Sequence, residues 1–276
     1  MSAELEPRSR EETVNGVRLH YLDWGDEGAQ PLLLLHGFTG HARSWDNFAR
    51  PMARHFRVVV LDQRGHGDSA WTDDYGGEAM VADVDAFVRQ LGLRRFVLLG
   101  LSMGGSNALN YAGKHPEEVE RLIVVDIGPE MDTAGVVRIQ AGVTANDIFE
   151  TKEEAFERAR AANPRPPAEH QRFRIYHNLM PTPDGKWTWK YDKALRSGQP
   201  RHRIDPEQSW ANWRGIRCPT LLIRGELSDI LSVDVADRMV REHRSCELVT
   251  VMGSGHPIPL DKPEEFEAVV GKWLNV

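Results

Sequence analysis

Cysteine is scarce in this chain of 276 residues, which contains only Cys218 and Cys246. Two cysteines cannot form the disulfide framework on which many small secreted folds depend. Their spacing also matches no metal-binding motif, so no metal site is predicted. Both stand at the starts of apolar stretches and are expected to be inert thiols at the beginnings of buried strands.

Long apolar runs and a basic excess are also missing. No segment reaches the roughly 20 apolar residues that a membrane-spanning helix needs. The first ten residues are polar and charged, without the apolar region of a signal peptide. Because the formal net charge is -7 and the pI is about 5.9, neither nucleic acid nor an anionic membrane is expected as a partner. These absences predict a cytoplasmic protein and leave the oligomeric state open.

The chain instead has short apolar runs separated by helical patterns. Runs of this kind predict strands buried on both faces, at 32–35, 57–61, 96–99, 119–126, 219–225 and 247–252. Apolar residues alternate on either side of Asn15-Gly16, a pair favoured in tight turns, and so predict an antiparallel hairpin over 13–24. Strands interleaved with helices predict a mostly parallel sheet with helices on both faces.

This alternation breaks between residues 128 and 217. Prolines interrupt several short amphipathic pieces there, and tryptophans are concentrated in the same region. We therefore predict a core domain of residues 1–127 and 218–276 and an inserted, mostly helical cap of residues 128–217. Trp187 and Trp210 are candidates for a substrate-binding wall, although such rings can also attach a cap to its core.

The most informative motif is Gly100-x-Ser102-x-Gly104, which lies between a predicted strand and a predicted helix. A turn this tight forces its central residue towards positive φ and leaves room only for small neighbours, which explains the two glycines. The turn lifts Ser102 out of the sheet and places it at a helix N-terminus, where developing negative charge is favoured. This arrangement is known as a nucleophile elbow.

Serine is a weak nucleophile at neutral pH and needs a base, which in turn needs an acid to orient it. His256, between Gly255 and Pro257 after the last predicted strand, is the candidate base. Asp229, in a polar loop after the preceding strand, is the favoured acid. Asp126, which ends the strand after the Ser102 helix, is the alternative because it too could reach the histidine.

An attacked carbonyl also needs N–H donors for its developing negative charge. The N–H of Met103, directly after the serine, and that of Phe38, in the glycine-rich turn after His36-Gly37, are the expected donors. The side chain of Phe38 can then line the substrate pocket. The segment 62–69 contains Asp62 and His66, but we interpret it as structural turn chemistry.

Together these segments resemble the α/β-hydrolase superfamily, and more narrowly its capped, cofactor-free serine esterases. The resemblance implies a mostly parallel eight-stranded sheet with helices on both faces and an inserted helical cap. It implies Ser102 as nucleophile, His256 as base, Asp229 as acid, and Phe38 and Met103 as oxyanion donors. The implied activity is hydrolysis of a small-molecule carboxylic ester without a cofactor.

Other activities of similar proteins can be compared at single positions. Haloalkane dehalogenases and epoxide hydrolases place an aspartate where this chain has Ser102, which argues against both. Lactone hydrolysis and cleavage of a carbon–carbon bond remain alternatives, as do lyase and perhydrolase side activities. A ligand receptor that keeps the three residues is also an alternative. The acyl and alcohol groups of the substrate are not specified by the sequence.

Overall fold

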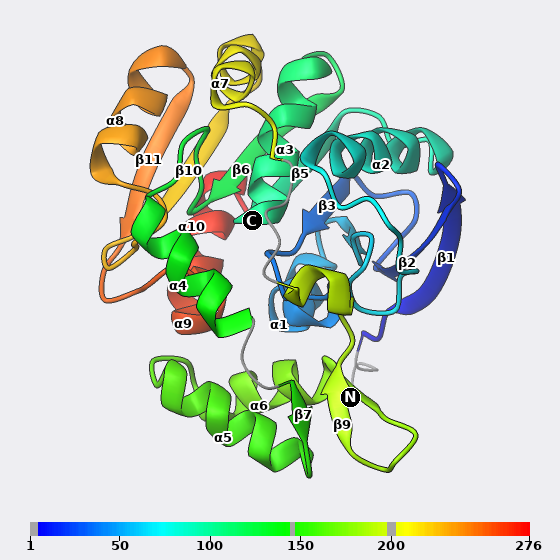
Figure 1. The fold of residues 1–276 in the computed structure, drawn as a ribbon. Helices are drawn as coiled ribbons and strands as arrows, with labels where there is room; N and C mark the ends of the chain where they lie inside the picture. Colours follow the sequence, from blue (N-terminus) through cyan, green and yellow to red (C-terminus); the bar gives the residue numbers. More distant parts are fainter. Residues whose placement is uncertain (1–4, 144–146, 198–202) are drawn as a thin grey trace.

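The structure, a computed structural model, describes residues 5–143, 147–197 and 203–276. Its centre is an eight-stranded sheet with the order β1-β2-β4-β3-β5-β6-β10-β11 (Figure 1). The strands are β1 (Arg8–Val14), β2 (Val17–Trp24), β3 (Pro31–Leu35), β4 (Arg57–Leu61), β5 (Phe96–Leu101), β6 (Val119–Val125), β10 (Thr220–Gly225) and β11 (Cys246–Val251). The pairs β1–β2 and β2–β4 are antiparallel, and every other pair in this sheet is parallel. The predicted fold class is therefore confirmed.

The hairpin and the buried strands form for the predicted reasons. Asn15 and Gly16 connect β1 to β2 with φ values of 51° and 75°, as a tight hairpin turn requires. In β3, Leu33 and Leu35 pack into one core cluster, whereas Leu32 and Leu34 pack into the other. Because both faces of the strand are buried, its sequence is continuously apolar.

Helices cover both faces of the sheet (Figure 1). One face packs against α2 (Gly77–Gln90), α3 (Met103–Lys114), α7 (Pro206–Gly215) and α8 (Val233–Glu242). The other packs against η1 (Ala42–Trp45), α1 (Asp46–Met52), α9 (Ile258–Asp261) and α10 (Pro263–Leu274). In open sheets of this kind, ligand sites form from the loops at the carboxyl ends of the parallel strands.

The segment between β6 and β10 is the predicted insertion. It contains α4 (Thr133–Val143), α5 (Lys152–Ala162), α6 (Ala168–His177), η2 (Lys193–Arg196), α7 and a small antiparallel sheet of β7 (Ile148–Phe149), β9 (Trp187–Trp189) and β8 (Leu179–Pro181). In Figure 1, α5, α6 and β9 lie at one end of the molecule, whereas α4 overlaps the core in this view. The end of the insertion packs differently, because Trp213 of α7 is fully buried in the main core. The domain boundaries at 128 and 217 stay a prediction.

Both cysteines are free and buried, as expected. Cys218 precedes β10, and Cys246 begins β11. Burial raises the pKa of the Cys218 thiol to about 11 and that of Cys246 to about 12. Because the thiolate is the reactive form, neither side chain is suited to nucleophilic chemistry.

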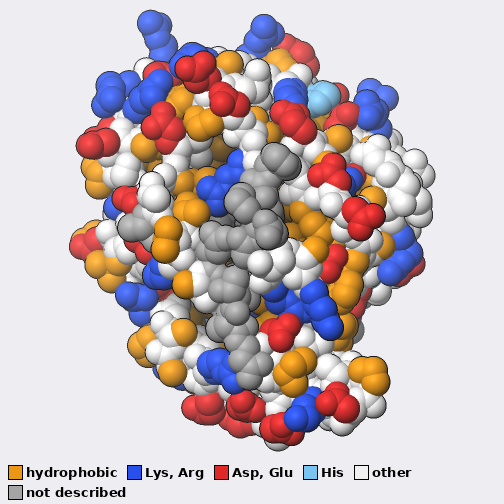
Figure 2. Space-filling model, in the orientation of Figure 1, with side chains coloured by type: hydrophobic (Ala, Val, Ile, Leu, Met, Phe, Trp, Pro, Cys, Tyr) orange, Lys and Arg blue, Asp and Glu red, His pale blue; other side chains and the backbone are white. Residues whose placement is uncertain are grey.

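Charge and hydropathy at the surface agree with the composition. Within the described ranges, no helix is both long enough and apolar enough to cross a bilayer. On the face drawn in Figure 2, the described acidic and basic side chains are interspersed, without a broad basic patch. The absence of a nucleic-acid or membrane partner and the cytoplasmic location stay predictions.

Candidate active site

Ser102 occupies the tight turn between β5 and α3. Its φ of 53° is a conformation that residues other than glycine rarely adopt. A Cβ at Gly100 would lie 2.2 Å from the carbonyl oxygen of Gly104, and one at Gly104 would lie 2.4 Å from that of Leu35. Glycine is therefore required on both sides of the serine, and the expected turn geometry is confirmed.

His256 lies in the loop between β11 and α9 and contacts the serine. Its Nε2 is 2.8 Å from Ser102 Oγ, and its Nδ1 is 2.7 Å from Asp126 Oδ2. The three side chains thus form one hydrogen-bonded chain that joins the ends of three strands. In this arrangement Nδ1–H donates to the carboxylate, which leaves Nε2 able to accept the serine proton.

Asp126 directly follows β6 and is completely buried. Its carboxylate accepts hydrogen bonds from the N–H of Gly225 at 2.9 Å, from the hydroxyl of Ser228 and from His256. Asp126 has a φ of 52°, so it is the second non-glycine residue at this site, after Ser102, with left-handed backbone geometry. Three donors from two loops therefore fix the carboxylate, and it points at the histidine.

The expectation that Asp229 would orient His256 is wrong. Asp229 is partly exposed and accepts two hydrogen bonds from the Arg138 guanidinium, at 2.5 and 2.7 Å. The hydrogen bond and charge of Arg138 hold the pKa of Asp229 below its usual value. In this loop the Ser228 side chain points towards Asp126. The Asp229 side chain therefore points towards Arg138 of α4 and not towards His256. The alternative acid, Asp126, is the one that the structure brings to His256.

The predicted oxyanion residues lie on either side of the serine. Met103 is the first residue of α3, directly after Ser102. Phe38 follows Gly37, where a Cβ would lie 3.3 Å from the Cβ of Ser102. The structure therefore brings the glycine-rich turn and the start of α3 together at the serine. The role of the two N–H groups as oxyanion donors stays a prediction.

The side chains of Phe38 and Met103 belong to an apolar cluster that also includes residues of the insertion between β6 and β10. The other members are Tyr75, Met80, Ile139, Trp189, Tyr191 and Leu195. Trp189 stacks on Tyr191, whose ring centroid is 6.4 Å from that of Phe38. The insertion therefore contributes Ile139 from α4, the aromatic pair at the end of β9 and Leu195 from η2 to the cluster that contains Phe38 and Met103.

The two tryptophans proposed for substrate binding lie elsewhere. Trp187 packs, as does Trp189, against a second cluster around Phe149 and Phe156, and it lies 4.3 Å from the ammonium of Lys152. Trp210 is buried in the main core, where its indole N–H donates to Glu130. Neither belongs to the cluster that contains Phe38 and Met103. The structure therefore places Trp189, two residues from Trp187, in that cluster and leaves Trp187 and Trp210 outside it. The substrate-binding role of Trp187 and Trp210 stays a prediction.

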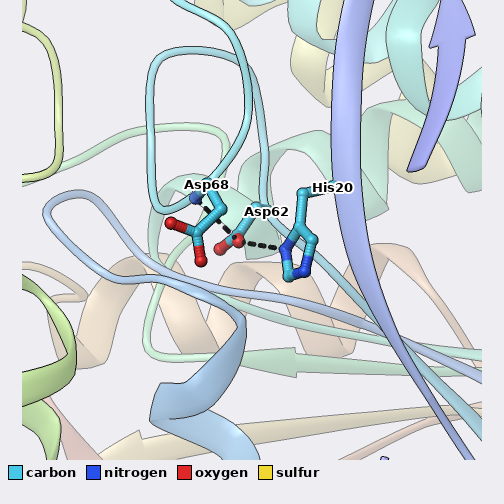
Figure 3. A group of neighbouring side chains, drawn as sticks. All are labelled: His20, Asp62 and Asp68. Carbon is cyan, nitrogen blue, oxygen red and sulfur yellow. Dashed lines mark hydrogen bonds and ion pairs between the residues drawn. The ribbon is translucent and has the colours of Figure 1, made fainter. Parts of the chain in front are cut away.

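A histidine and two aspartates outside this site also lie close together (Figure 3). Asp62 Oδ2 accepts from His20 Nδ1 at 2.7 Å and from the N–H of Asp68 at 3.1 Å, and Oδ1 accepts from the N–H of Ala42 at 2.5 Å. A Cβ at Gly67 would lie 2.1 Å from this carboxylate. Protein donors therefore satisfy both carboxylate oxygens of Asp62, which is not suited to binding a cation. Its hydrogen bonds fix the loop after β4, in agreement with the structural role interpreted from the sequence.

Comparison with known proteins gives the same assignment as the fold. Residues 32–269 match the model of the alpha/beta hydrolase family. The chain is 30% identical over 263 residues to the sn-1-specific diacylglycerol lipase ABHD11 of Mus musculus, covering 91% of this chain and 82% of the relative. It is also 30% identical over 255 residues to the 3-hydroxybutyrate-oligomer hydrolase of Cupriavidus necator, covering 87% of each.

Solved structures with this fold align over nearly the whole chain. An alpha/beta hydrolase from Novosphingobium aromaticivorans has a TM-score of 0.84 and 29% identity, covering 100% of this chain and 99% of that one. The E-2-(acetamidomethylene)succinate hydrolase has a TM-score of 0.88 over 98% of this chain and 100% of its own, and at 22% identity it supports the fold alone. The family match, the named relatives and the shared architecture show that this chain is a hydrolase and belongs to the alpha/beta hydrolase family.

Proposed function

We propose that this hydrolase cleaves carboxylic esters through an acyl-enzyme intermediate on Ser102. The observation that carries the proposal is the hydrogen-bonded chain from Asp126 through His256 to Ser102, with distances of 2.7 and 2.8 Å. The relatives at 30% identity are named as a lipase and an oligomer hydrolase, which supports an ester as the substrate. A serine at this turn, with a histidine in contact, is the arrangement that acyl transfer needs.

In the first half of the reaction, Ser102 Oγ attacks the carbonyl carbon while His256 Nε2 accepts its proton. The carbonyl oxygen becomes an oxyanion, which the N–H groups of Phe38 and Met103 stabilise. When the tetrahedral intermediate collapses, the bond to the alcohol oxygen breaks and His256 returns the proton to that oxygen. The alcohol leaves, and the acyl group remains bonded to Ser102.

In the second half, water takes the place of the alcohol. His256 accepts a proton from the water as its oxygen attacks the acyl carbon, and then gives the proton to Ser102 Oγ as the ester bond breaks. Asp126 stays ionised and stabilises the imidazolium that forms in each half. All proton transfers use side chains of this chain and water, so the proposed reaction needs no cofactor.

The apolar cluster beside the serine indicates the acyl group. Phe38 and Met103 would present their side chains to the substrate while their N–H groups serve the oxyanion. Ile139 and Trp189, partly buried against the same cluster, would continue this wall from the cap. We therefore propose a small ester with an apolar acyl chain. Lactones and carbon–carbon bonds remain alternatives for the same three residues.

Turnover of p-nitrophenyl butyrate tests the proposal. We expect steady release of many equivalents of p-nitrophenol per enzyme, with an initial burst if deacylation is slow. The corresponding p-nitroanilide should react far more slowly, since its leaving group is poorer. A single stoichiometric burst without further turnover would contradict an esterase, and so would failure to hydrolyse any of a panel of acyl esters.

Trp189→Ala should change the acyl preference without changing the chemistry. Loss of apolar contact with a longer chain should lower kcat/KM for an octanoate ester about tenfold relative to an acetate ester. Trp187→Ala, two residues away on the same strand, is the control and should leave this ratio unchanged. Equal ratios in the two variants would show that Trp189 does not line the acyl site.

A further inference from the structure

The direction of the Phe38 N–H is set by the carbonyl on the other side of the same peptide bond. The Gly37 oxygen accepts from His36 Nδ1 at 2.9 Å and from the N–H of Gly40 at 2.8 Å. In a planar trans peptide the N–H points opposite to the C=O. Whatever holds the Gly37 carbonyl in place therefore also aims the Phe38 N–H.

The ring of His36 can play this part in only one tautomer. The backbone N–H of Gln63 donates to His36 Nε2 at 3.0 Å, so this nitrogen must carry a lone pair and the proton must lie on Nδ1. His36 is only 1% exposed, and burial lowers its pKa. The neutral ring is thus favoured, with Nδ1–H directed at Gly37.

Two side-chain amides extend this arrangement to the helix that follows the serine. The amide nitrogen of Gln63 donates to the His36 carbonyl at 2.7 Å, and its oxygen accepts from the amide nitrogen of Asn107 at 2.7 Å. Gln63 and Asn107 are each 3% exposed. The His36 carbonyl requires the amide nitrogen of Gln63 on its side, which turns the Gln63 oxygen towards the amide nitrogen of Asn107, so the chain from Asn107 to His36 has one orientation.

This chain joins the two elements that carry the oxyanion donors. Asn107 lies in α3, which begins with Met103, whereas His36 begins the turn that contains Phe38. The two elements are also in close backbone contact, since a Cβ at Gly104 would lie 2.6 Å from the His36 carbonyl oxygen. Backbone contact prevents the elements from approaching further, and the amide chain adds a side-chain link beyond the last pair of β3 and β5, Leu35 and Gly100.

We propose that Gln63 and Asn107 are positioning residues for the oxyanion hole. Their amides hold the His36 carbonyl against α3, so that the N–H groups of Phe38 and Met103 converge on one point beside Ser102. Neither residue touches the substrate in this account. The predicted effect on kcat rests on the ester hydrolysis proposed above. The predicted effect on the geometry of the turn does not depend on it.

The kinetic test compares Asn107→Leu with Asn110→Leu. Asn110 is a buried asparagine one turn further along α3, and its amide bonds to Ser106 and Asn212, away from the turn. Asn107→Leu should lower kcat about 10- to 100-fold with KM within about threefold, because donors that are misplaced by a fraction of an ångström stabilise mainly the transition state less well. Affinity for a trifluoromethyl ketone analogue should fall in parallel. Asn110→Leu should leave both kcat and the affinity for this analogue unchanged. It should lower the melting temperature, as Asn107→Leu does, because each substitution removes buried hydrogen bonds.

A double substitution tests whether the two amides act as one unit. Gln63→Leu alone should lower kcat at least as much as Asn107→Leu, and the double variant should be little worse than Gln63→Leu. Gln63→Glu tests the contact with the His36 carbonyl if either leucine variant does not fold, since an ionised carboxylate can still accept from Asn107 but has no proton to donate to that carbonyl. Additive losses would contradict a connected chain.

Amide hydrogen exchange tests the structural claim without relying on catalysis. Exchange over residues 36–40 should become faster in Asn107→Leu and Gln63→Glu, but not in Asn110→Leu. If the wild type lacks esterase activity, the proposed function fails while this measurement still decides the positioning role. Unchanged exchange over the turn would overturn the inference, and so would a kcat for Asn107→Leu equal to that of Asn110→Leu at matched fractions folded.

Discussion

Ser102→Ala should abolish ester turnover while leaving the fold intact. The hydroxyl is the proposed attacking group, and its hydrogen bond to His256 is the only described side-chain contact that the substitution removes. Loss of one member of such a group lowers kcat by about 10⁴- to 10⁶-fold in a comparable serine hydrolase. Alanine has the same backbone restrictions as serine at a φ of 53°, so the turn gains no new strain.

The measurement is kcat on an activated ester together with the melting temperature. We expect activity at the background rate and a melting temperature within a few degrees of the wild type. Residual activity above a few per cent would contradict the nucleophilic role of Ser102. A large fall in melting temperature would instead show that the hydroxyl contributes to folding.

Asp126→Asn should lower kcat about 10⁴-fold, by analogy with the corresponding substitution in serine proteases. An amide that offers its NH₂ group to His256 Nδ1 would favour the tautomer with the proton on Nε2. That nitrogen could then not accept the serine proton. The amide also lacks the charge that stabilises the imidazolium.

Asp229→Asn is the matched control, because the sequence alone favoured this residue. Its carboxylate bonds to Arg138 at a partly exposed position, where an ion pair contributes little to stability. We expect kcat within about threefold of the wild type and a small change in melting temperature. A larger loss of kcat from Asp229→Asn than from Asp126→Asn would reverse the assignment.

The choice between these two acids shows where prediction from the sequence ends. Asp126 follows β6 and Asp229 follows β10, and these strands are neighbours in the sheet, so both aspartates lie near His256. Which side chain turns inward depends on the loop. Ser228 and the Gly225 N–H both bond to the Asp126 carboxylate, and these contacts are set by backbone geometry that the local sequence does not specify.

The core and the serine turn could be predicted because strong local constraints act there. Strands buried on both faces must be apolar throughout, as Leu32–Leu35 are. Glycine is required on both sides of Ser102, because a Cβ at Gly100 or Gly104 would overlap neighbouring backbone atoms. Because such constraints limit which residue types a position can hold, they can be recognised in the sequence.

The cap was less predictable because its elements are short and its aromatic residues have two possible roles. Trp187 and Trp189 alternate with Thr188 in a three-residue strand, and nothing in that spacing shows which ring extends towards Phe38. Trp210 lies in α7, which was assigned to the insertion but packs its tryptophans into the main core. Asn107 was also missed, since one polar residue in a buried helix has no sequence pattern of its own.

Reaction with a fluorophosphonate, followed by peptide mass spectrometry, tests the central claim most directly. The account predicts one phosphonyl group per chain, bonded to Ser102 Oγ, with complete loss of ester turnover. Labelling should be absent in Ser102→Ala, slowed by orders of magnitude in Asp126→Asn and nearly unchanged in Asp229→Asn. Ester turnover that continues with Ser102 fully labelled, or inactivation with the label on another residue, would contradict it.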